Sequence, residues 1–282
     1  MDTSKHVMFV GGPGSGKSNY LFRTWIAIEH ETGLLRKSGL PPELDYLHEG
    51  ASSLFSGAFA PHTSIDAPSI AEIPITFTES TALSLLTVPD VSGEVWDGIY
   101  QKREWPVAWD PYIARHCGFA LFIRAGSPHN VKPLDWLTCE RLHNTRGAAR
   151  ADTRVPTQVV LVDWLQTLRA LTLQETKTRD TPRLSVVVTA WDTVGENTGP
   201  IDYLNREFPL FGQFLDAGLH GFDTRVFGMS IAGGDLDDHD FRTRFLAGNP
   251  TNHGYCVTQH GRRTERSEDV LQPMYWALGH GK

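Results

Sequence analysis

The sequence lacks the features that would place the chain in a membrane or on a nucleic acid. No apolar run approaches the roughly 18 residues of a transmembrane helix. Lys and Arg number 26 against 33 Asp and Glu, and the resulting net charge of -7 argues against general nucleic-acid binding, which needs a clustered positive face. The N-terminus has no signal-peptide pattern, so we expect a cytoplasmic protein.

Cysteine is scarce, and the sequence shows no domain boundary. Cys117, Cys139 and Cys256 are scattered, odd in number and without the spacing of metal ligands, which is typical of reduced cytoplasmic thiols. The 12 histidines show no such spacing either, so we treat them as structural or surface residues. Because the sequence contains neither an internal repeat nor a linker, we expect one domain over residues 1–282.

The sequence does contain a complete phosphate-binding pattern near its N-terminus. Gly11-Gly12-Pro13-Gly14-Ser15-Gly16-Lys17-Ser18 satisfies G-x-x-x-x-G-K-[ST]. An apolar run at 6–10 predicts a strand before it, and helical spacing from Asn19 to His30 predicts a helix after it. In this context the loop N–H groups, with Asn19 at the helix start, point at a nucleotide's phosphates. We expect Lys17 to reach the β- and γ-phosphates and Ser18 to place its hydroxyl on Mg²⁺.

Strands alternate with helices along the rest of the chain. This order predicts an α/β, three-layer P-loop NTPase fold whose mostly parallel central sheet has one antiparallel edge strand. We predict strands at 73–78, 83–88, 119–123, 184–189 and 224–230, with the first two joined as a hairpin. Pro74 favours an edge position for the first of them. Helices are predicted at 158–173, with Val159 and Leu173 on its apolar side, at 201–217 and at 267–278.

Two segments are predicted to be loops. Residues 33–68 are rich in glycine, proline and serine. The segment is long for a connection within a compact domain, and such long loops are often functional. The polar stretch 233–254 is predicted to be a surface insertion.

A second motif follows the predicted strand at 83–88. In Asp90-Val91-Ser92-Gly93, the aspartate stands at the carboxyl edge of the sheet and can hold Mg²⁺ through water. Gly93 can offer its N–H to a γ-phosphate and release it, which is the logic of a switch. The alternative is an ordinary strand-terminating turn.

With Thr189-Ala190-Trp191-Asp192 and Ser230-Ile231-Ala232 after two later strands, the chain resembles the Ras-like, translation-factor-related class of GTPases. The order of motifs is the same over nearly the whole chain, with 33–70 as an enlarged first switch region. The Asp-Val-Ser-Gly-Glu segment and the tryptophans after it look like the bacterial double-GTPase families. Those families are encoded in predicted conflict or antiviral-defence gene clusters beside GTPase-associated proteins.

The resemblance implies GTP and GDP as ligands, with base contacts at both late motifs. Asp192 would accept hydrogen bonds from the guanine N1–H and amine, and Thr189 would brace the phosphate loop. Ala190 departs from the family, which has a lysine stacking on the base there; Trp191 is one position late but offers an aromatic surface. The alternative for Asp192 is a helix cap or turn residue.

Glu94 stands where many members of this class carry a water-orienting glutamine. An ionised glutamate only accepts hydrogen bonds, so it can orient or deprotonate water but repels the γ-phosphate. We therefore expect slow intrinsic hydrolysis that a partner could raise. A switch threonine that closes over Mg²⁺ should precede the first hairpin strand, with Thr63 as the candidate and Ser64 and Ser69 as alternatives.

Two groups of side chains suggest partners. Trp96, Trp105 and Trp109 follow the switch glycine, and form either a nucleotide-gated surface for a protein effector or ordinary core. Arg103 is a candidate internal arginine finger. Further arginines surround a Gly-Ala-rich loop, as a solvated face, a site for an anionic partner or a kinase lid: Arg141, Arg146, Arg150 and Arg154.

The sequence thus predicts a slowly hydrolysing GTP switch in a bacterial defence or signalling complex. A P-loop kinase acting on a small molecule is the rival enzyme, and it predicts an acceptor pocket and an arginine-rich lid. A non-hydrolysing nucleotide-binding scaffold is the third alternative, with the tryptophan segment as its working surface.

Overall fold

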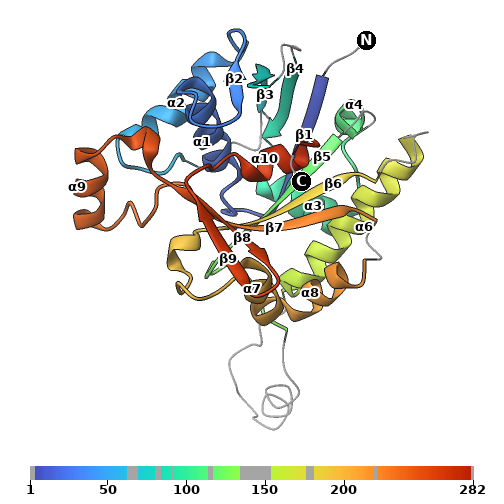
Figure 1. Ribbon diagram of the computed structural model, residues 1–282. Coiled ribbons are helices and arrows are strands. Elements are labelled where there is room, and N and C mark those ends of the chain that lie inside the picture. Colours follow the sequence, from blue (N-terminus) through green and yellow to red (C-terminus); the bar gives the residue numbers. More distant parts are fainter. Residues whose placement is uncertain are drawn as a thin grey trace.

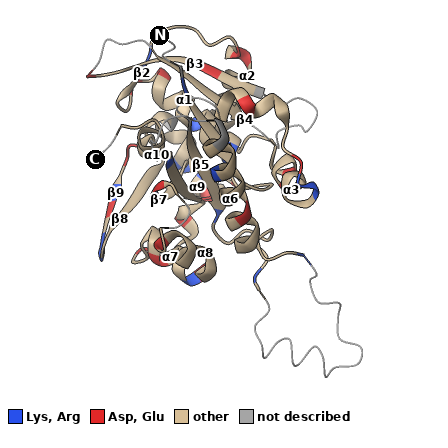
Figure 2. Ribbon diagram, turned by 90° about the vertical axis from the view of Figure 1, so that its right-hand side faces the viewer, with Lys and Arg blue, Asp and Glu red and all other residues tan. Residues whose placement is uncertain are grey.

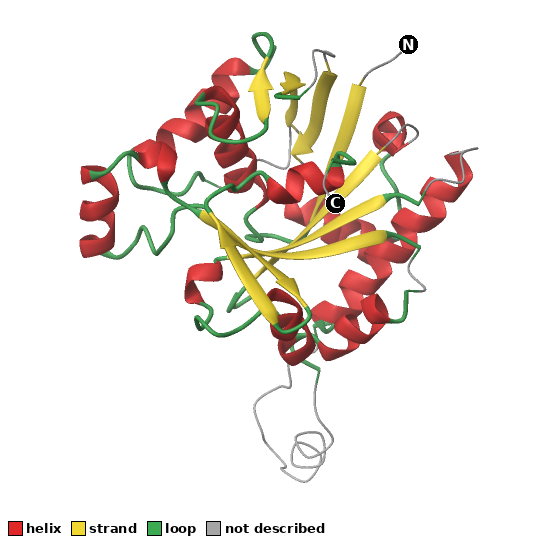
Figure 3. Ribbon diagram, in the orientation of Figure 1, coloured by secondary structure: helices red, strands yellow, loops and turns green. Residues whose placement is uncertain are grey.

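A computed structural model describes residues 4–61, 69–79, 84–90, 92–113, 117–133, 154–175, 181–218 and 221–280. It contains a nine-stranded sheet in the order β2-β3-β4-β1-β5-β6-β7-β8-β9, with helices on both faces (Figures 1 and 3). The predicted α/β fold with a mostly parallel central sheet is confirmed.

The central strands run parallel because helices connect them. They are β1 (Ser4–Val10), β4 (Ser84–Asp90), β5 (Cys117–Arg124), β6 (Arg183–Thr189) and β7 (Asp223–Ser230). Antiparallel strands flank them on both sides: β3 (Ser69–Phe77) and β2 (Leu35–Lys37) on one, β8 (Tyr255–His260) and β9 (Arg263–Ser267) on the other. In β6, residues from Leu184 to Thr189 are all buried, as expected of a strand covered on both faces.

Two apolar cores lie on the two faces of the sheet. One packs α1 (Lys17–Glu29), α2 (Leu44–Phe55), α9 (His239–Ala247) and α10 (Gln272–Ala277). The other packs α3 (Gly93–Lys102), α4 (Asp110–Ile113), α6 (Thr157–Glu175), α7 (Pro200–Glu207) and α8 (Pro209–Asp216). Basic and acidic positions are interspersed along these elements (Figure 2). Among the described helices, none combines the length and the apolar character needed to cross a bilayer.

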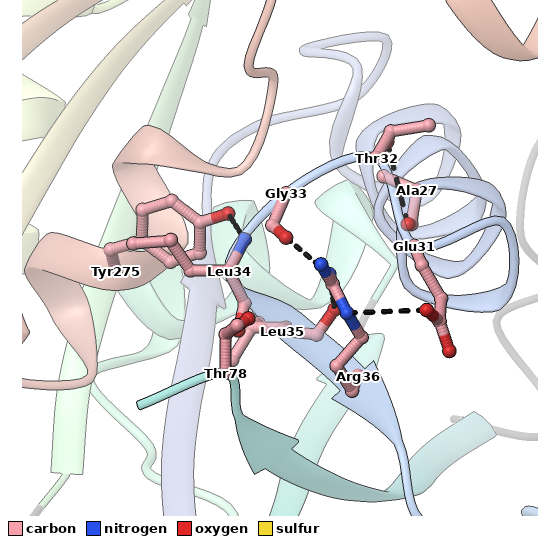
Figure 4. Close-up of polar contacts among 9 residues, drawn as sticks. All are labelled: Ala27, Glu31, Thr32, Gly33, Leu34, Leu35, Arg36, Thr78 and Tyr275. Atoms are coloured by element: carbon pink, nitrogen blue, oxygen red, sulfur yellow. Dashed lines mark hydrogen bonds and ion pairs between the residues drawn. The ribbon is translucent and has the colours of Figure 1, made fainter. Parts of the chain in front are cut away.

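The loop prediction for residues 33–68 is wrong for much of that stretch, because it contains β2 and α2. In α2, Leu47, Ala51 and Leu54 are buried, and this helical spacing was readable in the sequence. β2 begins at an ordered turn after α1, shown in Figure 4. There, the Tyr275 hydroxyl accepts from Leu34 N at 2.5 Å, and Thr78 Oγ1 donates to Leu34 O at 2.9 Å.

The antiparallel hairpin of β3 and β4 is confirmed, but β3 is not the outermost strand. β2 pairs with Ile75, Thr76 and Phe77 of β3. Pro74 lies just beyond this short ladder, so its missing N–H costs no pairing with β2. Its carbonyl oxygen still accepts from Ser38 N at 3.0 Å.

Three further element predictions need correction. The helix at 201–217 is two helices, because Pro209 cannot donate a backbone hydrogen bond and disfavours a helical Phe208, whose φ is -133°. The last helix begins at Gln272 rather than Ser267, which ends β9. The insertion at 233–254 contains α9, and the β8–β9 hairpin after it was not predicted.

The predicted helix at 158–173 is confirmed as α6, although its apolar side differs. Leu161, Leu165 and Leu168 are buried, whereas Val159 and Leu173 are 43% and 60% exposed. The burial of Trp164 explains the rotation, because this large side chain faces the core as well.

The tryptophan-rich segment from α3 to α4 is mostly core. The Trp96 ring lies 5.4 Å from that of Trp109 and 5.8 Å from that of Trp164, between centroids. Trp96 and Trp109 are buried, and Trp105 Nε1 donates to Asp110 at 2.9 Å. These contacts favour the core-packing alternative; among the described apolar residues of the segment, Val107 is exposed at 77%.

Candidate nucleotide-binding site

A cleft of about 330 Å³ opens at the carboxyl ends of the parallel strands, where doubly wound folds bind ligands. The predicted motifs meet there, although they are far apart in the sequence. Its lining comes from the phosphate loop (Pro13 to Asn19), from Ser92 to Glu94, from Thr189, Ala190, Asp192 and Thr193, and from Met229 to Ala232. Further lining residues, not identified from the sequence, are Phe59, Ala60, Pro61, Arg124, Gly234, Asp235 and Asp237.

The phosphate loop joins β1 to α1 as predicted. Gly16 has a φ of 93°, and a Cβ there would lie 3.2 Å from the Thr189 side chain, so both conformation and space favour glycine. Lys17 is 6% exposed, and its ammonium donates to Gly11 O at 2.7 Å and Gly12 O at 3.2 Å. A buried cation beneath a loop at a helix N-terminus suits the binding of phosphate groups.

Thr189 connects the end of β6 to the phosphate loop. Its Oγ1 donates to Ser15 O at 2.7 Å, and the bond is buried. This is the bracing contact that the resemblance implied. It fixes the loop against the strand that leads to Asp192.

Gly93 and Glu94 form the other end of the cleft. Ser92 caps α3: its Oγ accepts from Glu94 N at 3.3 Å and donates to the Glu94 carboxylate. Gly93 is buried, and a Cβ there would overlap backbone atoms of Gly12 and Pro13. The predicted switch glycine therefore packs directly on the phosphate loop, and the exposed Glu94 stands at its rim.

Asp97 is a neighbouring acidic residue that motif analysis did not find. It lies one helical turn after Gly93 on α3, beside Gly12. Burial raises the pKa of its carboxyl, and Glu94 raises it further, whereas Lys17 and His129 oppose the shift. Residues four apart share one face of a helix, so the position of Asp97 relative to Gly93 was the feature of the sequence that could have indicated its place.

The base end of the cleft is organised by Asp192 and Ser230. Ser230 Oγ donates to Asp192 Oδ1 at 2.5 Å and accepts from Gly233 N at 3.0 Å. The hydroxyl thus links the ends of β6 and β7 and holds the carboxylate at the cleft wall. Ile231 and Ala232 line the cleft beside it.

Trp191 does not provide the expected aromatic surface. Its side chain is 4% exposed, packs edge-on against Tyr203 at 5.6 Å and covers Gly228, so it belongs to the core beneath the sheet edge. Ala190, with a φ of 53°, turns the chain between Thr189 and Trp191 and itself lines the cleft.

A strap after α2 forms the outer wall of the cleft and brings Phe59 into it; we define the strap as residues 56–61. Asn19 Oδ1 accepts from Ala60 N at 2.9 Å, which ties the strap to the first turn of α1. Arg242 Nη2 donates to Ser56 O at 3.1 Å and ties the strap to α9. No sequence motif marked Phe59.

The predicted metal ligands are only partly placed. Ser18 lines the cleft, and Asp90 ends β4 opposite Ser69, although the structure does not describe the side chains of Asp90 and Ser69. Thr63 and Ser64 lie outside the described residues. The oxygen of Ser18, next to Lys17, fits a hard cation such as Mg²⁺.

Of the predicted arginines, the structure describes Arg103 and Arg154, and neither lines this cleft. Arg103 caps the end of α3, where it pairs with Asp163 and packs over the Tyr100 ring, so it is not placed as a finger. Arg154 lines a neighbouring cavity. Arg141, Arg146 and Arg150, like Cys139, are outside the described residues.

Comparison with known proteins identifies a family, and the solved structures that resemble the chain include a distant one. No curated protein sequence matches the chain. A solved structure of Methanosarcina barkeri Roco2 RocCORdC bound to GDP is 10% identical with a TM-score of 0.35, over 87% of this chain and 47% of that one. This chain therefore spans about half the length of that protein. The model of the Double-GTPase 1 family matches residues 8–277, and the chain belongs to that family.

Proposed function

We propose that the protein is a GTP-binding switch that hydrolyses GTP slowly. Residues 1–282 would form one GTPase domain, with 33–70 as an enlarged first switch region and 233–254 as an insertion. One observation carries the proposal: the Thr189–Ser15 hydrogen bond joins the base-recognition segment to the phosphate loop in a single cleft. Membership of the Double-GTPase 1 family supports it.

The phosphates would be held by backbone N–H groups from Gly11 to Asn19 and by Lys17. Lys17 would exchange its contacts with the Gly11 and Gly12 carbonyls for phosphate oxygens, so its ammonium stays hydrogen-bonded throughout and gains an opposite charge when a phosphate binds. Ser18, Asp90 and Thr63 would hold Mg²⁺, which when bound neutralises charge on the β- and γ-phosphates.

Guanine selectivity would come from Asp192. A carboxylate accepts from the two adjacent donors of guanine, N1–H and the exocyclic amine, and adenine lacks that pair. Ser230 holds one carboxylate oxygen in place. Ile231 and Ala232 would complete the base site.

Hydrolysis would depend on Gly93 and Glu94. Gly93 packs against Gly12 and Pro13, so binding of a γ-phosphate at the loop would shift the start of α3. The Glu94 carboxylate would release the Ser92 hydroxyl and then orient the attacking water. Its negative charge beside the γ-phosphate accounts for a low intrinsic rate.

A protein partner would bind α3 and the segment after it in one nucleotide state and not in the other. Val107 is a large exposed apolar residue there, whereas Trp96 and Trp109 are buried against each other and supply rigidity. We propose a cytoplasmic protein effector in a bacterial defence or signalling complex. The gene neighbourhood tests this context directly. Genes of the Double-GTPase 1 family that lie outside defence gene clusters would contradict it.

A P-loop kinase is the second candidate, because a cavity of about 400 Å³ adjoins the phosphate loop. Asp97, His129 and Arg154 line it together with Gly12 and Pro13. An acceptor molecule could bind there. The scaffold alternative is weakened, since the tryptophans that would form its working surface are largely buried.

Isothermal titration with GTP, GDP and ATP, with and without Mg²⁺, separates these functions. We expect GTP and GDP to bind more tightly than ATP, with Mg²⁺ strengthening GTP binding. ATP binding equal to or tighter than GTP binding would contradict the GTPase. Phosphate release from GTP without an acceptor distinguishes hydrolysis from both the kinase and the scaffold.

A further inference from the structure

Arg124 is the last residue of β5 and lines the nucleotide cleft, although no motif marks it. The strand order places β5 between β1, which leads into the phosphate loop, and β6, which leads into Thr189 and Asp192. In the parallel register, Arg124 is paired with Thr189. Arg124 therefore stands between the phosphate end and the base end of the cleft, where the nucleoside of a bound nucleotide must lie.

The side chain of Arg124 is exposed and has no hydrogen bond or ion pair with any other described residue. The contacts of this residue use its backbone carbonyl, which accepts from Asn130 Nδ2 at 2.8 Å. An arginine without a structural ion pair keeps both its charge and its planar surface for a ligand.

The walls of the cleft leave room for such a surface against a base. Ala190 contributes only a methyl group, and the ring of Trp191 is turned into the core. Among the described lining residues, Phe59 is the one aromatic side chain, and it is 37% exposed. A flat purine would therefore meet Phe59 from the strap and, from the sheet edge, Arg124.

We propose that the guanidinium of Arg124 packs on the face of the guanine base and, with Phe59, fixes the base for recognition by Asp192. Guanidinium planes stack on aromatic rings, and the positive charge adds a cation–π attraction. The assignment rests on the proposed guanine-nucleotide function, and it gives this chain a base-contacting residue on a strand other than the one that carries Asp192.

The test compares Arg124→Ala with the wild type by titration with GDP and by displacement of GDP with inorganic pyrophosphate. We expect GDP affinity to fall about tenfold and pyrophosphate affinity to stay unchanged, because only GDP carries a base. Arg124→Lys keeps the charge but loses the plane, so an intermediate loss is expected. Lys132→Ala is the matched control, since Lys132 is on the same connection but pairs with Glu207 instead.

A second variant guards against a folding defect. In Arg124→Ala combined with Ala190→Lys, the lysine stem can cover the base from the neighbouring strand, and GDP affinity should recover. Unchanged GDP affinity in Arg124→Ala, or an equal loss for GDP and pyrophosphate, would overturn the assignment. A wild type that binds pyrophosphate but not GDP would instead contradict the proposed function itself.

Discussion

The hydroxyl of Thr189 donates a buried hydrogen bond to the carbonyl oxygen of Ser15, 2.7 Å away. Thr189→Val keeps the shape of the side chain and leaves that carbonyl without its donor. We expect GDP affinity to fall about tenfold, because the loop loses the contact that fixes it. Thr243→Val is the control, since Thr243 Oγ1 donates only to His239 O on exposed α9. Equal GDP affinities in both variants would show that the brace is dispensable.

Gly93→Ala should uncouple α3 from the phosphate loop. The added methyl would overlap the backbone of Gly12 and Pro13, so the helix start must move away. We expect kcat for GTP hydrolysis to fall at least tenfold.

Gly98→Ala on the same helix is the matched control. A Cβ there meets nothing within 4 Å, and the higher helix propensity should raise stability by about 0.5–1 kcal/mol. Thermal melting and single-turnover kinetics on both variants give the answer. Normal hydrolysis in Gly93→Ala would remove Gly93 from the switch.

Glu94→Ala tests the water-positioning role. The carboxylate lies at the start of α3 and accepts from Ser92; among the described lining residues of the cleft, Glu94 is the one glutamate. We expect kcat to fall about a hundredfold with little change in GDP affinity. Unchanged kcat would exclude Glu94 from the mechanism. Glu94→Gln distinguishes orientation, which glutamine can supply, from proton transfer, which it cannot.

Asp97→Asn should stabilise the protein at neutral pH. Burial and Glu94 raise the pKa of the Asp97 carboxyl above its value in the unfolded chain. The unfolded state therefore ionises first, and stability is lost as pH rises through that range. Removing the charge should raise Tm at pH 7 but leave it unchanged near pH 3, below the ordinary aspartate pKa of about 3.9. A Tm difference that is the same at both pH values would contradict this account.

Arg23→Met should destabilise the fold by about 3 kcal/mol. This buried arginine on α1 donates to the carbonyl oxygens of Thr251, at 2.8 Å, and His253, and burial lowers its pKa to about 10. Both carbonyls would lose a charged donor. Urea unfolding against Arg244→Met, which removes an exposed arginine from α9, isolates the effect. Similar midpoints for the two variants would show that the buried contact adds nothing.

The sequence was enough to predict where Gly11 to Ser18 lie, because the glycine spacing and the helix that follows allow few backbone conformations for this loop. It also placed Asp192 just after β6 and Ser230 at the end of β7, because both strands are recognisable in the sequence. It could not show the direction of Trp191, whose burial depends on the space over Gly228 in the next strand. Phe59 and Arg124 were invisible for the same kind of reason: each acts through tertiary placement, with no local pattern. Helix α2 was missed although Leu47, Ala51 and Leu54 had helical spacing, because the glycines and prolines around it dominated the interpretation.

The two outermost strands of the sheet carry a consequence for how this protein behaves at high concentration. β2 has three residues, and β9 has five, with Arg263, Glu265 and Arg266 exposed along it. Short strands with charged side chains make poor templates for further strand addition. The sheet edges should therefore resist edge-to-edge polymerisation, and the protein should stay free of strand-mediated polymers as its concentration rises.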